Sequence, residues 1–319
     1  MSLGEFELID RYFTRPARRA VLGIGDDCAL LAASPGMQLA VSSDMLVEGR
    51  HFLSTVAPQR LGHKALAVNL SDLAACGARP LAFTLALAMP RADAAFLEPF
   101  SQGLLALADA QGCDLVGGDT TQGPLTICIT AFGEVPAGQA LLRSGALAGD
   151  DVYVSGTVGD ARLALEVFRG TLALPGDAFD AVRGAMEMPT PRVALGLALR
   201  GVATSAIDIS DGLLGDLAHI LRASRVGARI EVDAVPRSAT LREQPQHWQR
   251  ICTLAGGDDY ELLFTAPARL AAEVVAAGVA GGCGVTRIGR VEAAPGLRLV
   301  DANGAALPDT FIAFDHFRA

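Results

Sequence analysis

Short apolar segments alternate along the chain with turns rich in glycine and aspartate, and their spacing predicts a mixture of helices and strands. Apolar residues three or four positions apart, as at Leu66, Leu70 and Leu73, are typical of the buried face of a helix. The helices predicted in this way cover residues 5–12, 60–77, 94–111, 192–199, 213–223 and 268–277, and a further helix begins near residue 160. Alternating or short continuous apolar segments predict strands over residues 37–41, 81–89, 125–132, 150–154, 203–209, 228–232, 250–254, 286–291 and 297–300, and strand-like segments flank a turn at 25–27.

The order of these elements predicts two α/β (α+β) domains, each with a mixed sheet and packed helices. A chain of 319 residues is long enough for about two domains. One predicted strand ends at Gly133-Glu134-Val135-Pro136, and a new series of strands and helices begins near residue 150. We therefore expect one domain over residues 1–136 and a second over residues 137–319.

Composition excludes several classes of protein. Apolar residues make up 51% of the chain, but the longest apolar segments are far shorter than the roughly 20 residues of a membrane-spanning helix. The N-terminus has no signal-peptide core, so we expect a cytoplasmic protein. A net charge of −9, with no basic run interleaved with aromatics, argues against a nucleic-acid partner. The six cysteines are isolated, which favours thiols over zinc or disulfides.

Acidic residues recur beside glycine or serine where predicted strands end. The sequence shows this pattern at 25–27 (GDD), 42–44 (SSD), 117–119 (GGD), 208–211 (DISD) and 257–259 (GDD). Asp72 and Asn69 share one face of the predicted helix 60–77. Each acid alone has an ordinary explanation, because Asp and Ser are common in turns and Asp211 could cap the following helix. Carboxylates gathered at one site repel each other unless cations neutralise them, and oxygen ligands without His or Cys favour Mg²⁺.

The chain lacks a Walker-A phosphate loop. Its single lysine, Lys64, follows Leu61-Gly62-His63 and not a glycine-rich loop. Phosphate charge would then be met by arginine, for which Arg143 is a candidate, and by metal ions. The residues by themselves therefore predict a Mg²⁺-dependent, ATP-using enzyme without a P-loop.

Six segments in this order resemble the thiamine-monophosphate kinase family, within the aminoimidazole ribonucleotide synthetase-like ATP-binding superfamily. They are 23–29 (GIGDDCA), 43–52 (SDMLVEGRHF), 69–74 (NLSDLA), 116–121 (VGGDTT), 208–213 (DISDGL) and 257–262 (GDDYEL). The glycine–aspartate segments are shared across the superfamily, whereas 43–52, 257–262 and the terminal Asp315-His316-Phe317 are specific to the kinases. The resemblance covers essentially the whole chain.

This resemblance implies a fold, a reaction and a set of site residues. The fold is the two-domain, synthetase-like one, with an N-terminal metal- and ATP-binding domain that dimerises through its strands and a C-terminal domain that completes the site. The reaction is the ATP- and Mg²⁺-dependent phosphorylation of thiamine monophosphate by in-line transfer. The family's Mg²⁺ ligands match Asp27, Ser42, Ser43, Asp44, Asp72, Asp119, Asp208 and Asp211. Its ATP contacts match Gly118, Asp119, Arg143 and Ser210, and its substrate contacts match His51, Glu261 and Phe317.

No general base is expected, because the attacking phosphate oxygen is already anionic at neutral pH. His51 alone would more often be a structural hydrogen-bonding residue, and only its motif suggests a role in the site. Three alternatives remain open from the sequence. They are another synthetase of the superfamily, a nucleotide-binding regulatory module without turnover, and a multi-metal phosphohydrolase.

Overall fold

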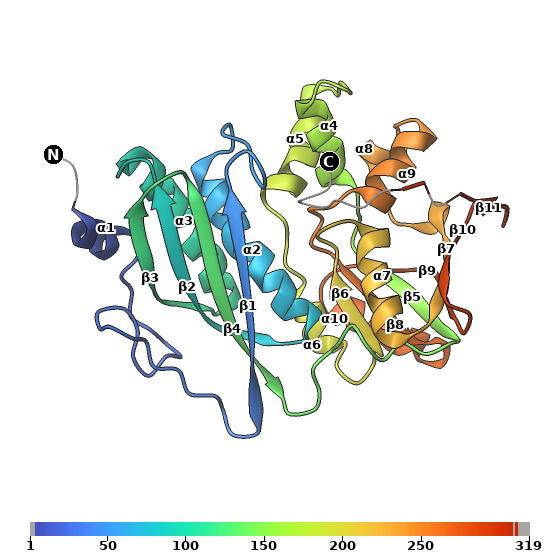
Figure 1. Ribbon diagram of the computed structural model, residues 1–319, viewed down its shortest axis with the longest axis horizontal. Coiled ribbons are helices and arrows are strands. Elements are labelled where there is room, and N and C mark those ends of the chain that lie inside the picture. The colour runs from blue at the N-terminus through green and yellow to red at the C-terminus, as the bar shows by residue number, and fades with distance from the viewer. Residues whose placement is uncertain (1–3, 309, 312–319) are drawn as a thin grey trace. The chain divides into compact units, whose positions relative to one another are not determined.

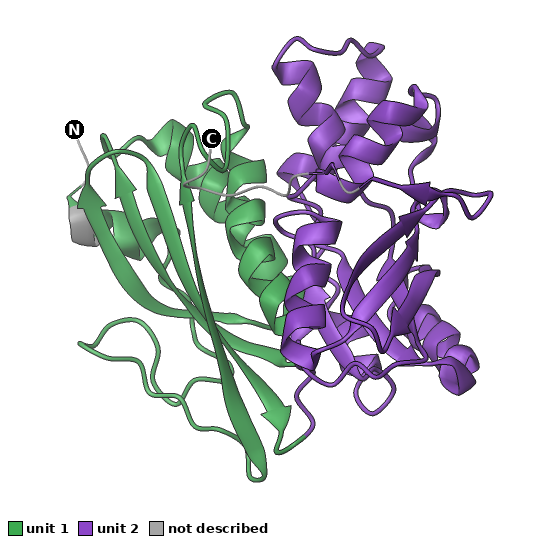
Figure 2. Cartoon of the chain, turned by 45° about the vertical axis from the view of Figure 1, so that its right-hand side comes forward, with its two compact units in different colours: residues 1–73, 78–138 green, residues 74–77, 139–319 purple. Residues whose placement is uncertain are grey.

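The structure, a computed structural model, describes residues 4–308 and 310–311. Its contacts divide the chain into two compact units, shown in green and purple in Figure 2. Unit 1 comprises residues 1–73 and 78–138, and unit 2 comprises residues 74–77 and 139–319. No helix within the described ranges is long and apolar enough to cross a membrane.

Unit 1 is a four-stranded sheet with helices on one face (Figure 1). The strands are β1 (Met37–Val47), β2 (Arg79–Met89), β3 (Asp114–Gln122) and β4 (Thr126–Pro136). Their order is β1-β4-β2-β3, so β1 and β3 are the two edges, and only the β2–β3 pair is parallel. The helices are α1 (Glu5–Tyr12), α2 (Pro58–Ala75) and α3 (Ala94–Gln111).

Glycines let α2 and α3 cross at close range. A Cβ on Gly62 would lie 2.0 Å from the Phe100 carbonyl oxygen, and one on Gly103 would lie 1.9 Å from the Gln59 oxygen. The apolar stripe predicted on α2 is buried, with Leu66, Leu70 and Leu73 at most 1% exposed. The close backbone approach fixes α2 against α3, and the buried stripe anchors α2 in the core of unit 1, which matters because α2 carries Asp72.

Unit 2 contains a seven-stranded mixed sheet. Its strands are β5 (Asp150–Ser155), β6 (Ser205–Asp208), β7 (Gly227–Glu231), β8 (Leu262–Pro267), β9 (Val285–Glu292), β10 (Gly296–Val300) and β11 (Ala306–Leu307). Their order is β11-β10-β7-β9-β5-β8-β6, and β10–β7 is the parallel pair. Helix α7 (Leu213–Ser224) follows β6 directly and packs Leu217 and Ile220 into the core against the sheet.

Further helices complete unit 2. They are α4 (Asp160–Phe168), α5 (Gly176–Glu187), α6 (Val193–Ala198), α8 (Ala239–Arg242), α9 (Gln246–Ala255) and α10 (Ala271–Ala280), with 3₁₀ turns η1 (Val232–Ala234) and η2 (Ala268–Leu270). Helices α4, α5, α8 and α9 form a second apolar cluster around Leu163, Val182 and Cys252 (Figure 1).

Three local predictions are wrong. Residues 250–254 form part of helix α9 and not a strand, because Trp248 and Cys252, four positions apart, both pack against the α4–α5 cluster. The strand-like segments around residues 25–27 form only isolated bridges, between Leu22 and Leu30 and between Ile24 and Asp26. Strand β1 does not stop at residue 41 but continues to Val47, because its whole length pairs with β4.

Candidate active site

Predicted ligands from β1 and α2 meet on the helix-covered face of the unit 1 sheet. The Ser42 hydroxyl donates a hydrogen bond to Oδ2 of Asp72 on α2. Asp44 lies two positions further along β1, whose ladder with β4 has no register shift, so its side chain points to the same face. All three side chains are partly exposed. Two carboxylates and a hydroxyl at this edge of the sheet are a donor set that suits Mg²⁺.

Asn69, one turn before Asp72, fixes the backbone of β1 at this point. Its side chain is fully buried, and its Oδ1 accepts the N–H of Asp44 at 3.1 Å. Its Nδ2 donates to the Ala65 carbonyl oxygen at 3.1 Å, so both ends of the amide are used. The sequence indicated that Asn69 and Asp72 share a helix face, but it gave no sign of the bond to β1.

Two other predicted ligands lie on the opposite face of the same sheet. The Ser43 hydroxyl bonds Oγ1 of Thr130 at 3.0 Å on this outer face. Asp119 on β3 pairs with Ala86 on β2, Ala86 pairs with Cys128 on β4, and Cys128 pairs with Met45 on β1. Because paired residues point to the same face of a sheet, Asp119 lies on the outer face with Met45. Ser43 and Asp119 therefore do not converge with Ser42 and Asp44 within unit 1.

Gly118 is required by strand pairing. The β2–β3 ladder has a register shift that leaves Val116 unpaired, and Gly118 follows with φ +148°. A Cβ there would lie 1.8 Å from the Leu85 carbonyl oxygen. This contact accounts for the glycine without a ligand, so the ATP contact of Gly118 stays a prediction.

Asp27 and His51 lie outside the regular strands. Asp27 is exposed in a turn, and its N–H donates to Oδ1 of Asp26. His51 lies in the turn after β1, where its Nδ1 accepts the N–H of Val47 at 3.0 Å. Because Nδ1 accepts, the neutral ring carries its proton on Nε2, which is a hydrogen-bond donor.

In unit 2 the predicted ligands lie in the loop between β6 and α7. Asp208 is the last residue of β6 and is 4% exposed, whereas Ser210 and Asp211 are partly exposed. Asp216 in the first turn of α7 lies behind the loop and accepts the backbone N–H groups of Ser210, Asp211 and Gly212. Burial, and then the charge of Asp211, raise the pKa of Asp216 to about 7. No sequence motif distinguished Asp216 from an ordinary residue in the first turn of a helix.

Arg143 and Asp211 lie near a common neighbour, His219 on α7. Burial lowers the pKa of His219, the positive charges of Arg143 and Arg222 lower it further, and the Asp211 carboxylate opposes them. Arg143 is exposed, and its carbonyl oxygen accepts from the Ser224 hydroxyl at the end of α7. The predicted ATP-binding arginine and one predicted metal ligand of unit 2 thus both act on the charge of the same α7 side chain.

Glu261 is enclosed in a buried network. It is 6% exposed, and its carboxylate accepts from Nε and Nη2 of Arg192 and from the Ser155 hydroxyl. Burial alone would lower the pKa of Arg192, but the bonds and charge of Glu261 outweigh this and raise it. The carboxylate is therefore held in a fixed orientation. No pattern in the sequence pointed to Arg192 or Ser155 as its partners.

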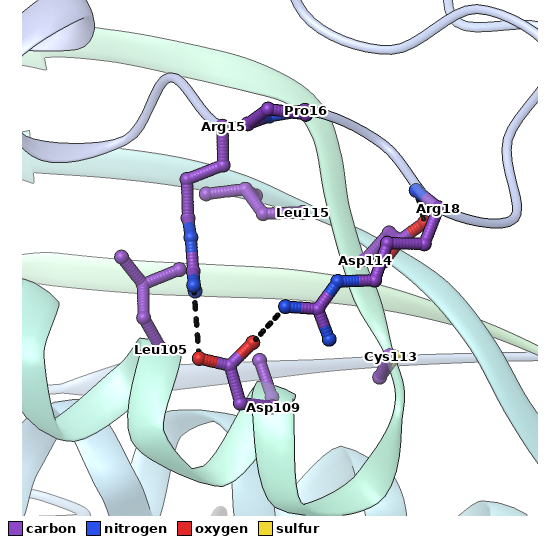
Figure 3. Close-up of a pocket in the computed structure, with 9 residues that line it drawn as sticks. Arg15, Pro16, Arg18, Leu105, Asp109, Cys113, Asp114 and Leu115 are labelled. Carbon is purple, nitrogen blue, oxygen red and sulfur yellow. Dashed lines mark hydrogen bonds and ion pairs between the residues drawn. The ribbon is translucent and has the colours of Figure 1, made fainter.

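The remaining predictions are not placed in a site. Phe317 lies outside the described residues. Among residues 4–308 and 310–311, no three His, Cys, Asp or Glu side chains are close enough to form a ready metal site. A small pocket in unit 1 contains none of the predicted site residues (Figure 3). Its Arg15 and Arg18 both pair with Asp109, at 2.9 and 3.3 Å, so this carboxylate already neutralises part of their charge.

Family models match both parts of the chain. Residues 25–135 match the N-terminal domain of the AIR synthase related proteins, and residues 147–302 match their C-terminal domain. A thiamine-monophosphate kinase from Salmonella typhimurium is 49% identical over 273 residues, which cover 84% of each chain. The chain belongs to the thiamine-monophosphate kinase family.

Solved structures of the thiamine-monophosphate kinase family have the same fold. The enzyme from Stenotrophomonas maltophilia matches with a TM-score of 0.87 and 45% identity, covering 96% of this chain and 99% of its own. A second structure, "AaThiL complexed with AMPPCP and TMP", matches with a TM-score of 0.76 and 29% identity, covering 90% and 89%. The two-domain α/β architecture expected from the sequence is confirmed.

Proposed function

We propose that this protein transfers the γ-phosphoryl group of ATP to thiamine monophosphate, giving thiamine diphosphate and ADP. The observation that carries the proposal is the family relative solved as a complex with AMPPCP and TMP, which is 29% identical to this chain. AMPPCP is an ATP analogue, so that complex pairs a nucleotide with a phosphate-bearing acceptor. The oxygen-rich donors of both units are chemically suited to such a pair of polyanions.

The residues of this chain divide into metal-binding and orienting groups. Asp44, Asp72 and Ser42 would hold Mg²⁺ in unit 1, and Asp208 and Asp211 would hold it in unit 2. When bound, Mg²⁺ supplies the positive charge that allows two phosphate groups to approach. Asp27, Ser43 and Asp119 remain further proposed ligands, with Gly118 and Ser210 as nucleotide contacts.

Orientation and charge are the main contributions of the protein. The exposed Arg143 would neutralise charge on the transferring phosphoryl group, and the Nε2–H of His51 can donate to a phosphate oxygen. The fixed carboxylate of Glu261, with Phe317, would orient the thiamine moiety. The acceptor oxygen is already anionic, so no side chain needs to remove a proton.

We further propose that the active form is a cytoplasmic homodimer. Asp44 and Asp119 lie on opposite edges of the unit 1 sheet, about 14 Å apart at three strand spacings, and on opposite faces. One ion cannot be held by both carboxylates of the same chain. The outer face also exposes Leu39, Val41 and Met45, at 45%, 59% and 54%. A second copy packed on this face would cover these apolar side chains, and its Asp119 would then lie on the same side of the sheet as Ser43.

The decisive experiment incubates the protein with ATP, Mg²⁺ and thiamine monophosphate and separates the products by chromatography. We expect thiamine diphosphate and ADP in equal amounts. Free phosphate released without ATP would indicate a phosphohydrolase, and nucleotide binding without any product would indicate a regulatory module. Free phosphate or AMP formed from ATP, without thiamine diphosphate, would indicate a synthetase of the superfamily.

A further inference from the structure

One buried carboxylate holds three consecutive amides of the loop that carries Ser210 and Asp211. The N–H groups of Ser210, Asp211 and Gly212 donate to Oδ2 of Asp216 at 3.1, 3.2 and 3.1 Å. Asp216 is only 3% exposed and belongs to α7, the helix that begins directly after the loop. Three donors on one oxygen leave the loop little freedom to change its backbone conformation.

The other side of the loop is held by the segment 257–261. The Ser210 carbonyl oxygen accepts the Asp258 N–H, and the Ile209 carbonyl oxygen accepts the Tyr260 N–H, each at 2.8 Å. The Ile209 N–H donates to the Glu261 carbonyl oxygen at the same distance. Asp258 and Tyr260 adopt positive φ values of 71° and 53°, a conformation that non-glycine residues adopt only where surrounding contacts impose it.

These bonds turn the polar backbone of the loop inward. Amides near a helix N-terminus would ordinarily attract an anion, but here Asp216 occupies them. The groups left facing outward are the partly exposed side chains of Ser210 and Asp211. The loop therefore offers oxygen acceptors to a cation and does not offer backbone N–H groups to a phosphate.

We propose that Asp216 is a positioning residue that orients Ser210 and Asp211 toward a nucleotide-bound divalent cation. The nucleotide and cation in this inference rest on the proposed function, whereas the geometry of the loop is independent of it. A residue that acts only as a helix cap would affect stability, whereas a positioning residue also sets how much cation the loop requires. The two roles therefore predict different measurements.

The test compares Asp216→Ala and Asp216→Asn with the wild-type protein. An asparagine oxygen can still accept the three N–H bonds, whereas alanine leaves them without a partner. We expect Asp216→Ala to raise the Mg²⁺ concentration for half-maximal rate about tenfold and to lower kcat about 10- to 100-fold. We expect Asp216→Asn to stay within about threefold of wild type, and KM for thiamine monophosphate to change little in either variant.

Asp233→Asn is the matched control. Asp233 is an enclosed acid of unit 2 that pairs with Arg250 at 2.7 Å and is not bonded to the loop. Its loss should lower the melting temperature without changing the Mg²⁺ dependence. If Asp216→Ala folds and keeps the wild-type Mg²⁺ dependence and kcat, the proposal is overturned.

Further measurements test the proposal if the protein shows no turnover, or if the alanine variant does not fold. Calorimetric titration with Mg-AMPPCP should show weaker binding for Asp216→Ala, and hydrogen exchange should be faster at residues 210–212. If alanine prevents folding, Asp216→Glu displaces the carboxylate by one methylene and should show the same rise in Mg²⁺ requirement, whereas wild-type behaviour would contradict the proposal. A wild-type protein that makes no thiamine diphosphate would refute the proposed function, while the binding and exchange data would still test Asp216.

Discussion

Aspartate side chains in this protein fall into two groups that differ in what surrounds each carboxylate. Asp44 and Asp72 are partly exposed near hydroxyl and amide groups of β1 and α2. Asp216 and Asp259 accept backbone N–H groups, from residues 210–212 and from Gly159. Burial raises the pKa of both, to about 7 for Asp216 and well above its ordinary value for Asp259. The first group suits metal binding, and the second holds the backbone in place.

Removing a proposed metal ligand should abolish most of the activity without unfolding the chain. We expect Asp44→Asn or Asp72→Asn to lower kcat at least ~100-fold, because each removes a negative ligand beside the transferring phosphoryl group. Steady-state kinetics with circular dichroism as the check on folding measures this. Near-normal turnover in both variants would mean that the acidic group on β1 and α2 has another role.

Removing one partner of the Glu261 network should instead destabilise unit 2. The side chains of Arg192 and Glu261 are 20% and 8% exposed, so Arg192→Met leaves a buried carboxylate without its cation. We expect the free energy of unfolding to fall by about 3–5 kcal/mol, measured by urea denaturation. The double variant Arg192→Met/Glu261→Met should recover part of this loss, and no recovery would argue against a direct coupling of the two residues.

At the scale of elements, strand ends were predicted less well than strand centres. Ser42, Ser43 and Asp44 are polar, so the pattern of the chain ends the strand at residue 41, yet β1 continues because β4 supplies a pairing partner along its full length. Gly117 and Gly118, where the glycine–aspartate pattern suggested the end of a strand, likewise lie inside β3. A polar residue in an edge strand costs little when one side of it faces solvent, so polarity did not mark the end of either strand.

Adjacent glycines in β3 allow a matched test of this strand pairing. Gly118→Ala would place a Cβ 1.8 Å from the Leu85 oxygen at a φ of +148°, whereas a Cβ on Gly117 would meet nothing closer than 3.9 Å. We expect Gly118→Ala to lower the free energy of unfolding by at least about 2 kcal/mol and Gly117→Ala to change it by less than about 1 kcal/mol. Equal effects of the two substitutions in urea denaturation would contradict the steric explanation.

At the scale of the whole molecule, the sheet of unit 1 separates two sets of proposed ligands. Ser42, Asp44 and Asp72 lie on or against the helix-covered face, while Ser43 and Asp119 lie on the outer face with exposed apolar side chains. A sheet face that is apolar and carries proposed ligands is a reasonable surface for a second copy of the chain.

The homodimer proposal can be tested with charged substitutions at exposed valines. Val41→Glu places a charge in the proposed interface, so we expect the mass measured by light scattering to fall from two chains to one, and activity to fall with it. Val279→Glu on α10 is the control, because Val279 is 78% exposed in unit 2 and should leave the mass unchanged. A monomeric wild-type protein with full activity would overturn the proposal.

Local patterns in the amino-acid sequence were enough to establish the α/β class, the extents of helices such as α1 and α3, and the family to which the chain belongs. Helix periodicity is a local property, so apolar stripes and caps identified these elements without a partner. The recurring glycine–aspartate segments, in a fixed order, identified the family because each segment is read directly from the chain.

Which of these residues lie together emerged only from the folded chain. The order of the strands places Asp119 and Asp44 on opposite edges of the sheet. Pairing with β4 extends β1 through Ser42 and Ser43. Packing against α4 and α5 makes residues 250–254 helical. Asp216 and Arg192 carry no distinguishing motif, and the motif that begins at Asn69 did not indicate the bond of Asn69 to β1, because these roles depend on partners brought close by folding. Contacts between distant residues depend on sheet register and helix packing, which a linear pattern of residues does not specify.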